Sequence, residues 1–446
     1  MEKLFGTDGL RAVAGQFPLD YPSTFTLGKS LISLLKEEGL EPKVIIGRDT
    51  RESGEWIEKA LFLGIKNAKG EALSAGIIPT SALSFLTKKY HFSAGIVISA
   101  SHNPYQDNGI KIFSSQGLKI SEEWEERLEK AILSTPKKIK RKKIQIDHEL
   151  SFSEIYMDFL KSKFSNVRLV KKIKIVLDCS NGASSVIAPQ VFKDLGFGVE
   201  VLSNSPNGKN INDRCGSLYP QSLARKVVES RADIGIAYDG DADRAIWVDE
   251  RGNILNGDHT LFVQSRFMKE KGCLRKNTVV ATTMSNLGLE KALQKMGIEL
   301  VRTQVGDKYV LEKMIEINSN LGGEQSGHTI FLDDCPTGDG ILTSLKMLEV
   351  MTACNEPLSF LVRDFKEFPQ VFVNVPVARK IDFSEFPEIL KAVEEITNRL
   401  RGEGRLNLRY SGTEPLARVM IEGKDISEIE SYARRLSEVI AHCLGK

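Results

Sequence analysis

The chain has 446 residues and a formal net charge of +2, because 61 Lys and Arg stand against 59 Asp and Glu. At roughly 100–200 residues per domain, this length predicts about two to four domains. The nearly balanced charge argues against a nucleic-acid partner. The six Cys stand far apart with no CxxC pair, which excludes a disulfide scaffold and the common zinc-finger spacings.

The start of the chain shows no apolar region of the kind that signal peptides carry. One of the longest apolar stretches, residues 94–100, is far below the roughly 18 residues that a membrane helix needs. Together with the scattered Cys, these features predict a cytoplasmic protein with no membrane partner.

Short apolar strands alternate with segments of helical period, and one order of elements occurs three times. Each occurrence runs from a strand through a polar loop, a helix and a Gly to a second strand. In chain order the expected elements are 43–47, 54–68 and 94–100, then 174–178, a helix to 195 and 199–202, then 278–281, a helix to 296 and 298–301. Apolar strands separated by helices predict parallel strands in sheets covered on both faces. The sequence therefore predicts three similar α/β domains.

Changes in composition predict where the domains end. The first boundary follows a basic run at 137–143, which we interpret as a solvated linker rather than an anion-binding tract. From residue 369 the pattern changes to one strand and two helices, at 369–377, 386–400 and 426–444, which predicts a smaller α+β domain. The expected domains are 1–145, 146–250, 251–368 and 369–446.

Four loops rich in Gly, Ser or Asp directly follow apolar strands. Ligands of α/β folds bind at the carboxyl ends of strands, so we expect the four loops to share one cleft. The first loop presents Ser101, with His102 next to it in the chain. An Asn-Pro pair at 103–104 then turns the chain, and Lys111 follows downstream. It is either a nucleophile or phosphate carrier, or a turn whose polar groups satisfy the backbone. The absence of a GxSxG elbow argues against a serine hydrolase.

The second loop carries three carboxylates at alternate positions, Asp239, Asp241 and Asp243. Unpaired, they would repel one another, and a hard cation such as Mg²⁺ or Ca²⁺ relieves that repulsion. The same spacing occurs in EF-hands, but Arg244 stands where an EF-hand needs Gly, and the flanks read as strands. The loop predicts a metal site of another kind, against the alternative of a solvated acidic turn.

The third loop, residues 322–328, is rich in Gly, so a ligand can approach its backbone closely. Glu324 and Ser326 share one side of the loop and would suit the hydroxyl groups of a polyol. A Gly-rich hairpin without a ligand is the alternative. His328 alone is more typical of a structural hydrogen bond than of catalysis.

The fourth loop, residues 409–415, combines hydroxyl groups, backbone N–H groups and Arg side chains. Backbone N–H groups around a Gly can form an anion nest, and Arg offers a bidentate fork. The loop predicts a phosphate site rather than a plain turn. Its candidate residues are Arg409, Ser411, Gly412, Thr413 and Arg418. A serine, a metal, polyol contacts and a phosphate site are together the parts that phosphoryl transfer on a sugar needs.

These loops, in this order, resemble the α-D-phosphohexomutase superfamily, and most closely its amino-sugar branch. The resemblance also includes residues 4–11 (LFGTDGLR) and 47–54 (GRDTRESG) and covers essentially the whole chain. It implies three similar mixed-sheet α/β domains and a smaller C-terminal α+β domain, arranged around a central cleft.

The resemblance also assigns roles to residues. The active serine, carried as phosphoserine, matches Ser101. One Mg²⁺ per site would be bound by the serine phosphate together with Asp239, Asp241 and Asp243. The catalytic positions beside the phosphoserine match Arg11, His102 and Lys111. The substrate-binding positions match Arg244, Gly306, Asp307, Lys308, Glu324, Ser326 and His328. The distal phosphate site matches Arg409, Ser411, Gly412, Thr413 and Arg418.

The implied activity is that of an isomerase that interconverts glucosamine 6-phosphate and glucosamine 1-phosphate. Glucosamine 1,6-bisphosphate is the implied intermediate and activator, and a homodimer is an open expectation. A phosphomannomutase/phosphoglucomutase of the same superfamily is the alternative, because Lys308 replaces the Arg usual in the amino-sugar branch, and Ala12 and Ser81 also depart from it. More distant alternatives are a sugar-phosphate sensor and a metal-dependent phosphatase.

Overall fold

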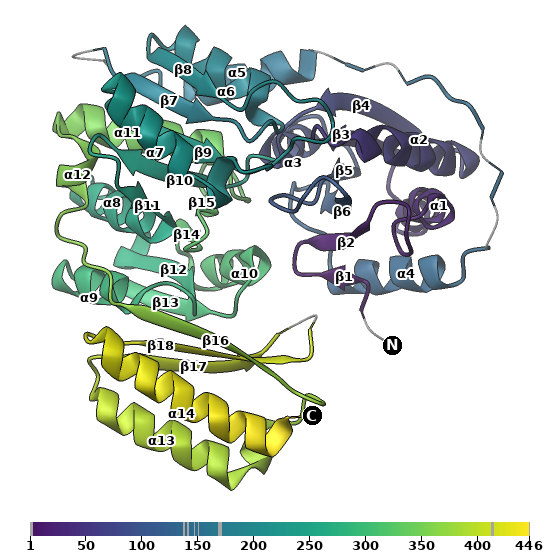
Figure 1. Ribbon diagram of the computed structural model, residues 1–446. Helices are drawn as coiled ribbons and strands as arrows, with labels where there is room; N and C mark the ends of the chain where they lie inside the picture. The colour runs from purple at the N-terminus through teal and green to yellow at the C-terminus, as the bar shows by residue number, and fades with distance from the viewer. Residues whose placement is uncertain are drawn as a thin grey trace. The chain divides into compact units, whose positions relative to one another are not determined.

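The structure is a computed structural model that describes residues 3–136, 139–140, 142–146, 148–149, 151–167, 172–411 and 414–445. The chain forms two compact units (Figure 1). The first consists of Met1–Thr282 and Leu300–Arg363, and the second of Thr283–Glu299 and Asp364–Lys446. Among the described residues, no helix combines the length and the apolar character that crossing a membrane requires.

The first unit begins with a six-stranded sheet of order β1-β2-β6-β5-β3-β4. Its strands are β1 (Phe5–Gly6), β2 (Gly9–Val13), β3 (Lys43–Arg48), β4 (Glu71–Ile77), β5 (Ala94–Ile98) and β6 (Asp107–Ser114). The β3 strand pairs in parallel with β4 and β5, whereas β6 runs antiparallel to β5 and β2. The parallel pattern read from the sequence therefore holds for the strand–helix repeat, and the mixed sheet implied by the resemblance is confirmed.

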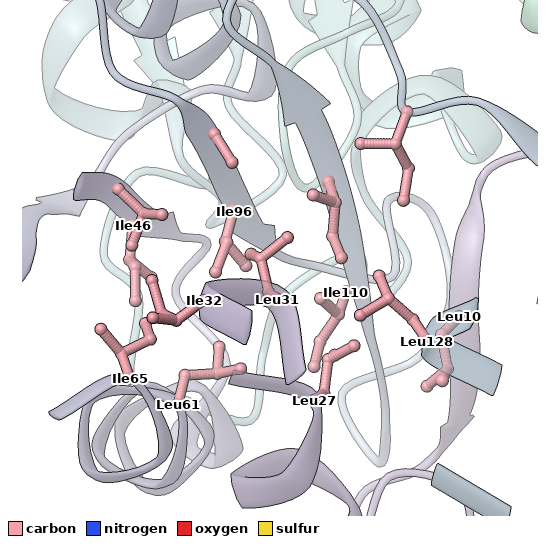
Figure 2. Close-up of a cluster of buried hydrophobic side chains, with 14 of the residues drawn as sticks. Leu10, Leu27, Leu31, Ile32, Ile46, Leu61, Ile65, Ile96, Ile110 and Leu128 are labelled. Atoms are coloured by element: carbon pink, nitrogen blue, oxygen red, sulfur yellow. The ribbon is translucent and has the colours of Figure 1, made fainter. Parts of the chain in front are cut away.

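Helices pack on this sheet through apolar side chains at helical spacing. They are α1 (Tyr21–Glu37), α2 (Glu52–Asn67), α3 (Thr80–Lys89) and α4 (Glu122–Leu133). Leu27 and Leu31 of α1 are one turn apart, and with Leu61 of α2 and Leu128 of α4 they meet Ile96 of β5 in one buried cluster (Figure 2). This core fixes the sheet whose strand ends carry the serine loop.

The second sheet has five strands in the order β11-β10-β9-β7-β8. They are β7 (Lys174–Asp178), β8 (Gly198–Leu202), β9 (Ile234–Tyr238), β10 (Ala245–Asp249) and β11 (Ile254–Leu255). The helices of this region are α5 (Ser151–Ser162), α6 (Ser184–Asp194), a 3-10 turn (Gly216–Leu218) and α7 (Gln221–Ser230). The β7 strand is parallel to β8 and β9, and β10 returns antiparallel to β9, so the triple-Asp loop is a turn between two neighbouring strands.

The third sheet has the order β13-β12-β14-β15, with β14 parallel to β12 and antiparallel to β15. Its strands are β12 (Thr278–Thr282), β13 (Glu299–Thr303), β14 (Leu321–Gly323) and β15 (Thr329–Phe331). The helices of this part are α8 (Gly257–Glu270), a 3-10 turn (Arg275–Asn277), α10 (Asp307–Ile317), α11 (Gly340–Cys354) and α12 (Leu358–Leu361).

The second unit is built on an antiparallel sheet of order β16-β18-β17, as expected for the α+β C-terminal part. It comprises β16 (Gln370–Pro376), a 3-10 turn (Phe383–Glu385), α13 (Pro387–Leu400), β17 (Arg405–Tyr410), β18 (Leu416–Glu422) and α14 (Ile426–Leu444). It also includes α9 (Leu287–Lys295), which the sequence pattern places in the third repeat. The buried Glu422 explains this grouping, because it pairs with Arg405 at 2.7 Å and accepts the Leu287 N–H at 3.3 Å.

Three polar side chains from distant parts of the first unit meet in its interior. The Tyr156 hydroxyl donates to Asp339 Oδ2 at 2.7 Å and lies 3.0 Å from Ser81 Oγ. Asp339 Oδ1 accepts the N–H groups of Ile341 and Leu342, and so caps α11. Burial raises the pKa of Asp339 to about 6.

The Asp339→Asn variant should gain stability relative to the unchanged protein as the pH rises from 4 to 7. The folded-state pKa of about 6 lies above the ordinary value of 3.8, so between these values the folded protein holds the proton more tightly than the unfolded chain. Asp339 therefore stabilises the folded protein at a pH below its unfolded-state pKa. This contribution, about 3 kcal/mol in all, is lost as the pH rises through the folded-state pKa. Asn keeps the capping oxygen without the titration. Melting temperatures of both proteins across this range provide the check, and a difference that stays constant with pH would contradict the expectation.

Candidate active site

Ser101 is presented by a tight turn directly after β5. It has a φ of +51°, an uncommon conformation for a residue with a side chain, and is fully buried. Its Oγ donates to Asp239 Oδ2 at 2.5 Å. Because Asp239 follows β9 of the second sheet, the first two predicted loops meet at this hydrogen bond.

A buried ion pair holds the serine turn in place. Arg51 Nε lies 2.9 Å from Asp49 Oδ2, and neither side chain is exposed. The same guanidinium donates to the Ser101 carbonyl at 2.9 Å and to the Pro104 carbonyl at 2.6 Å. Asn212 donates to the Ser101 carbonyl from the second-sheet region at 2.8 Å. The position of the serine hydroxyl is therefore set by groups beneath the turn.

The triple-Asp loop forms a buried group of carboxylates. Asp239, Asp241 and Asp243 each offer one oxygen, and these oxygens lie within 4.8 Å of one another. The Oδ1 atoms of Asp241 and Asp243 are buried without a hydrogen-bond partner. Such oxygens are costly to bury unless a cation takes them, so the donor set fits a hard divalent cation such as Mg²⁺. The flanks are strands, which confirms that this is not an EF-hand.

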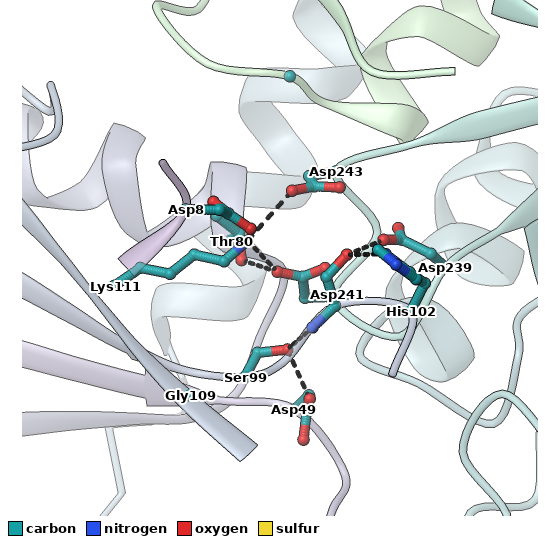
Figure 3. A network of polar contacts seen from close by, with 12 residues as sticks. Asp8, Asp49, Thr80, Ser99, His102, Gly109, Lys111, Asp239, Asp241 and Asp243 are labelled. Atoms are coloured by element: carbon teal, nitrogen blue, oxygen red, sulfur yellow. Dashed lines mark hydrogen bonds and ion pairs between the residues drawn. The ribbon is translucent and has the colours of Figure 1, made fainter. Parts of the chain in front are cut away.

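Lys111 of β6 is the cation inside this group (Figure 3). Its Nζ lies 2.9 Å from Asp241, 3.2 Å from Asp243 and 3.0 Å from Asp8, with 1% of its side chain exposed. Burial disfavours the charge, but the three carboxylates outweigh burial and raise the pKa of Lys111 well above its ordinary value. Lys111 is therefore an ammonium group in this state.

The remaining groups beside the serine are a histidine and two arginines. His102 Nδ1 lies 3.4 Å from Ser101 Oγ. Burial, with the charges of Arg244 and Arg11, lowers the pKa of His102 to about 3, so the ring is neutral at neutral pH. Arg244 Nε lies 3.9 Å from Asp239 Oδ2. Arg11 Nη1 donates to Asn103 Oδ1 of the serine turn at 3.4 Å. Two cationic side chains thus lie near the serine turn, an arrangement that suits an anionic group there.

The Gly-rich third loop is the turn of the hairpin between β14 and β15. Glu324 Oε1 accepts the Gly306 N–H at 3.2 Å. Ser326 Oγ is buried without a hydrogen-bond partner, which favours a ligand over a bare hairpin. His328 Nδ1 lies 3.6 Å from Asp243 Oδ2, so the hairpin reaches the carboxylate group.

The segment at the start of α10 divides between two environments. Gly306 caps the helix with a φ of +136°, a conformation that favours glycine. Asp307 lies 3.7 Å from His328 Nε2, next to the carboxylate group. Lys308 instead pairs with Glu122 of α4 at 3.3 Å. The first two residues therefore join the site, whereas substrate binding by Lys308 stays a prediction.

The fourth loop lies in the second unit. Arg409 and Arg418 face each other on β17 and β18. Arg418 Nη2 donates to Ser411 Oγ and to Glu414 Oε2, each at 3.0 Å. Burial, together with Arg418, lowers the pKa of Arg409. Two adjacent guanidinium groups and a hydroxyl suit an anion. The other two predicted residues of this loop, Gly412 and Thr413, lie outside the described residues.

Sequence reasoning missed three residues that organise the site. Asp8 pairs with Lys111, Arg51 holds the serine turn, and Lys119 bridges Asp8 and Asp307. Asp8 and Arg51 stand inside the two motifs that carry the resemblance, and this was the signal that could have found them. Lys119 follows the turn after β6 and forms an isolated bridge with Phe113, and its sequence context gives no such signal.

Models of known protein families match this chain along most of its length. Four family models, described as phosphoglucomutase/phosphomannomutase, match in succession. They are alpha/beta/alpha domain I at residues 2–138, domain II at 154–252, domain III at 256–368 and the C-terminal domain at 372–439.

Solved structures share the fold. A phosphoglucomutase/phosphomannomutase family protein from Burkholderia thailandensis has a TM-score of 0.80 at 21% identity, with 99% of this chain and 98% of that one covered. The N-acetylphosphoglucosamine mutase of Aspergillus fumigatus, in complex with GlcNAc-6P and magnesium, has a TM-score of 0.71 at 18% identity, with 99% and 96% covered.

Relatives at higher identity carry one name. The phosphoglucosamine mutase of Koribacter versatilis is 45% identical, over 100% of this chain and 98% of that protein. The phosphoglucosamine mutase of Caldicellulosiruptor bescii is 46% identical, over 99% of each chain. Identity at this level over the full length shows that the chain belongs to the phosphoglucosamine mutase family of phosphohexomutases, an isomerase family, as its loops predicted.

Proposed function

We propose that this chain interconverts glucosamine 6-phosphate and glucosamine 1-phosphate through a phosphoserine at Ser101 and a glucosamine 1,6-bisphosphate intermediate. The observation that carries the proposal is the 2.5 Å contact of the Ser101 hydroxyl with Asp239, inside a carboxylate group that has two buried oxygens without a hydrogen-bond partner. A hydroxyl beside a cation site is what phosphoryl transfer requires. The name shared by the full-length relatives supports the amino-sugar substrate.

In the first half of the proposed reaction, the P–O bond to Ser101 breaks and a new one forms to the free hydroxyl of glucosamine 6-phosphate. That hydroxyl loses a proton and Ser101 Oγ gains one. In the second half the bisphosphate returns its other phosphoryl group to Ser101, and both proton movements reverse. The neutral ring of His102, 3.4 Å from Ser101 Oγ, is the proposed acceptor of the sugar proton, and the Lys111 ammonium is the proposed donor of the proton that Ser101 Oγ gains.

Mg²⁺ is the cation that we propose for Asp239, Asp241 and Asp243, where it would neutralise charge on the transferred phosphoryl group. Arg11 and Arg244 lie near the serine turn and would stabilise the same charge.

For the sugar we propose Glu324, Ser326 and His328, together with Gly306, Asp307 and Lys308. The buried Ser326 hydroxyl, which has no hydrogen-bond partner, supports this assignment. For the phosphate that is not reacting we propose Arg409, Ser411, Gly412, Thr413 and Arg418. From the family resemblance we also propose that the protein is located in the cytoplasm and forms a homodimer.

The proposal is tested on the purified protein by two measurements. Peptide mass spectrometry should find phosphate on the Ser101 peptide, either as purified or after incubation with glucose 1,6-bisphosphate. Turnover assays should give a higher kcat/KM for glucosamine 6-phosphate than for glucose or mannose phosphates. A preference for a neutral sugar would favour a phosphomannomutase/phosphoglucomutase, and a Ser101 that refuses phosphate would overturn the proposal.

Arg51→Lys should lower kcat about 100-fold with little change in KM, because the lysine keeps the charge beside Asp49 but loses the fork that holds the serine turn. The matched control is Arg48→Lys. Arg48 ends β3 three residues before Arg51 and pairs with the buried Glu58 at 3.2 Å, but among the described residues it contacts no carbonyl of the serine turn. Steady-state kinetics of both variants test this expectation. An equal loss of kcat in the two variants would contradict the role of Arg51 in holding the serine turn.

A further inference from the structure

The charged side chains of the site form a closed ring of ion pairs that joins all three sheet regions of the first unit. In order around the ring, the N–O distances are 3.2, 3.0, 2.8, 2.6, 3.7 and 3.6 Å. The members in that order are Asp243, Lys111, Asp8, Lys119, Asp307 and His328. Two of them, Asp8 and Lys119, have no part in the proposed chemistry.

Lys111 would share two of its three carboxylates with the proposed divalent cation. Its Nζ contacts the Oδ2 atoms of Asp241 and Asp243, and the Oδ1 atoms of the same two carboxylates are those available to the cation. A buried ammonium group whose counterions are neutralised by a second cation pays a large desolvation penalty. Among the described residues, Asp8 is the other carboxylate paired with Lys111, and it lies outside the cation-binding group.

Asp8 is itself fixed so that its two oxygens have separate partners. Lys111 lies 3.0 Å from Oδ2, which also pairs with Arg11 Nη2, whereas Lys119 lies 2.8 Å from Oδ1. Lys119 is 15% exposed, donates to the Thr7 carbonyl at 3.1 Å, and pairs with Asp307 at 2.6 Å. One lysine thus anchors Asp8 and connects it to the region of His328.

We propose that Asp8 and Lys119 are positioning residues of the mutase site. Asp8 holds the Lys111 ammonium when a divalent cation takes Asp241 and Asp243. Lys119 fixes Asp8 and ties it to Asp307. The proposal rests on the proposed function, because it assumes a divalent cation at the three carboxylates.

The first test measures Mg²⁺ binding by isothermal titration calorimetry, which needs no sugar and no turnover. Asp8→Asn should raise the Mg²⁺ dissociation constant about tenfold in the unchanged background, because Lys111 then competes for the cation ligands. In the Lys111→Met background the same change should shift the constant less than about twofold. Equal weakening in both backgrounds would mean that Asp8 acts directly by its charge, and no weakening in the first would mean that it does not act; either result overturns the proposal.

The second test uses kinetics and does not depend on the folding of Lys111→Met. Lys119→Met should lower kcat about tenfold with KM within about threefold, and Lys119→Arg should restore most of the rate, because its fork can bridge both carboxylates. The matched control is Lys163→Met, which removes a lysine paired at 2.9 Å with Asp334 in the same unit. An unchanged protein that binds Mg²⁺ without turning over glucosamine phosphates would overturn the proposed function alone. A Lys119→Met loss that Lys163→Met reproduces, or that Lys119→Arg leaves in place, would overturn the role of Lys119.

Discussion

Ser101→Ala should fold normally and lose mutase activity by at least about ten thousand-fold, because the group that carries the phosphoryl between the two half-reactions is gone. The side chain removed is one hydroxyl whose hydrogen bond goes to Asp239. The turn itself is held through the Ser101 carbonyl by Arg51 and Asn212, and these bonds do not involve the side chain. Turnover of glucosamine 6-phosphate and a phosphate search on the Ser101 peptide measure the effect.

A second buried serine of the same sheet region provides the control. Ser81 is fully buried and hydrogen-bonded to the Tyr156 hydroxyl at 3.0 Å. Ser81→Ala should cost about 1 kcal/mol of stability through that bond and leave turnover within about threefold. Residual activity of Ser101→Ala within about a hundredfold of the unchanged protein, or phosphate found on another residue, would show that the phosphoryl carrier lies elsewhere.

The strands and the loops after them were readable from the sequence, because both follow from local pattern. The buried run at 174–178 is β7 as expected, and the expected helix 426–444 is α14. The triple-Asp turn was placed between the correct strands, since an acidic loop between two apolar runs has few alternatives. What made these predictions succeed is that a strand and its turn are specified by adjacent residues.

The interaction partners of the site residues could not be predicted from the sequence, because they come from contacts between distant segments. Lys111 was expected near the serine, yet its ammonium lies among Asp8, Asp241 and Asp243. Lys308 has the same side-chain chemistry in a motif of the resemblance, and its partner is Glu122. No periodicity distinguishes these two lysines, since only the fold decides which carboxylate each one meets.

The helix α9 also has contacts with distant segments that its own sequence pattern does not specify. Its spacing from β12 follows the strand–helix pattern of the first two sequence repeats, so the sequence pattern assigns α9 to the third repeat. It groups with the second unit because Arg405 Nη2 donates to the Ser285 carbonyl at 2.9 Å while pairing with the buried Glu422. A hydrogen bond between residues 120 positions apart leaves no trace in the sequence pattern of either segment.

The carboxylate group leads to the other large effect that we expect. Asp241→Asn should weaken Mg²⁺ binding at least about 100-fold and mutase activity about 1000-fold, because one of the three negative charges is lost. Asp241 Oδ2 already accepts Thr80 Oγ1 at 2.5 Å and Lys111 at 2.9 Å, whereas its Oδ1 is buried and unpartnered. The neutral amide has a single oxygen, and when this oxygen keeps the contacts with Thr80 and Lys111, an NH2 group that cannot bind a cation takes the place of Oδ1.

Calorimetry with Mg²⁺ and assays before and after treatment with EDTA check this expectation, with Asp249→Asn as the control. Asp249 is an equally buried carboxylate at the end of β10, but both of its oxygens are occupied, by Arg251 N–H and by Asn253 at 2.8 to 2.9 Å. Its loss should leave Mg²⁺ affinity within about twofold, because only an unsatisfied oxygen is available to a cation. If Asp241→Asn kept the Mg²⁺ affinity of the unchanged protein, or if EDTA left turnover intact, Asp241 would not be a ligand of a cation needed for turnover, and Lys111 would be the permanent counterion of Asp241 and Asp243.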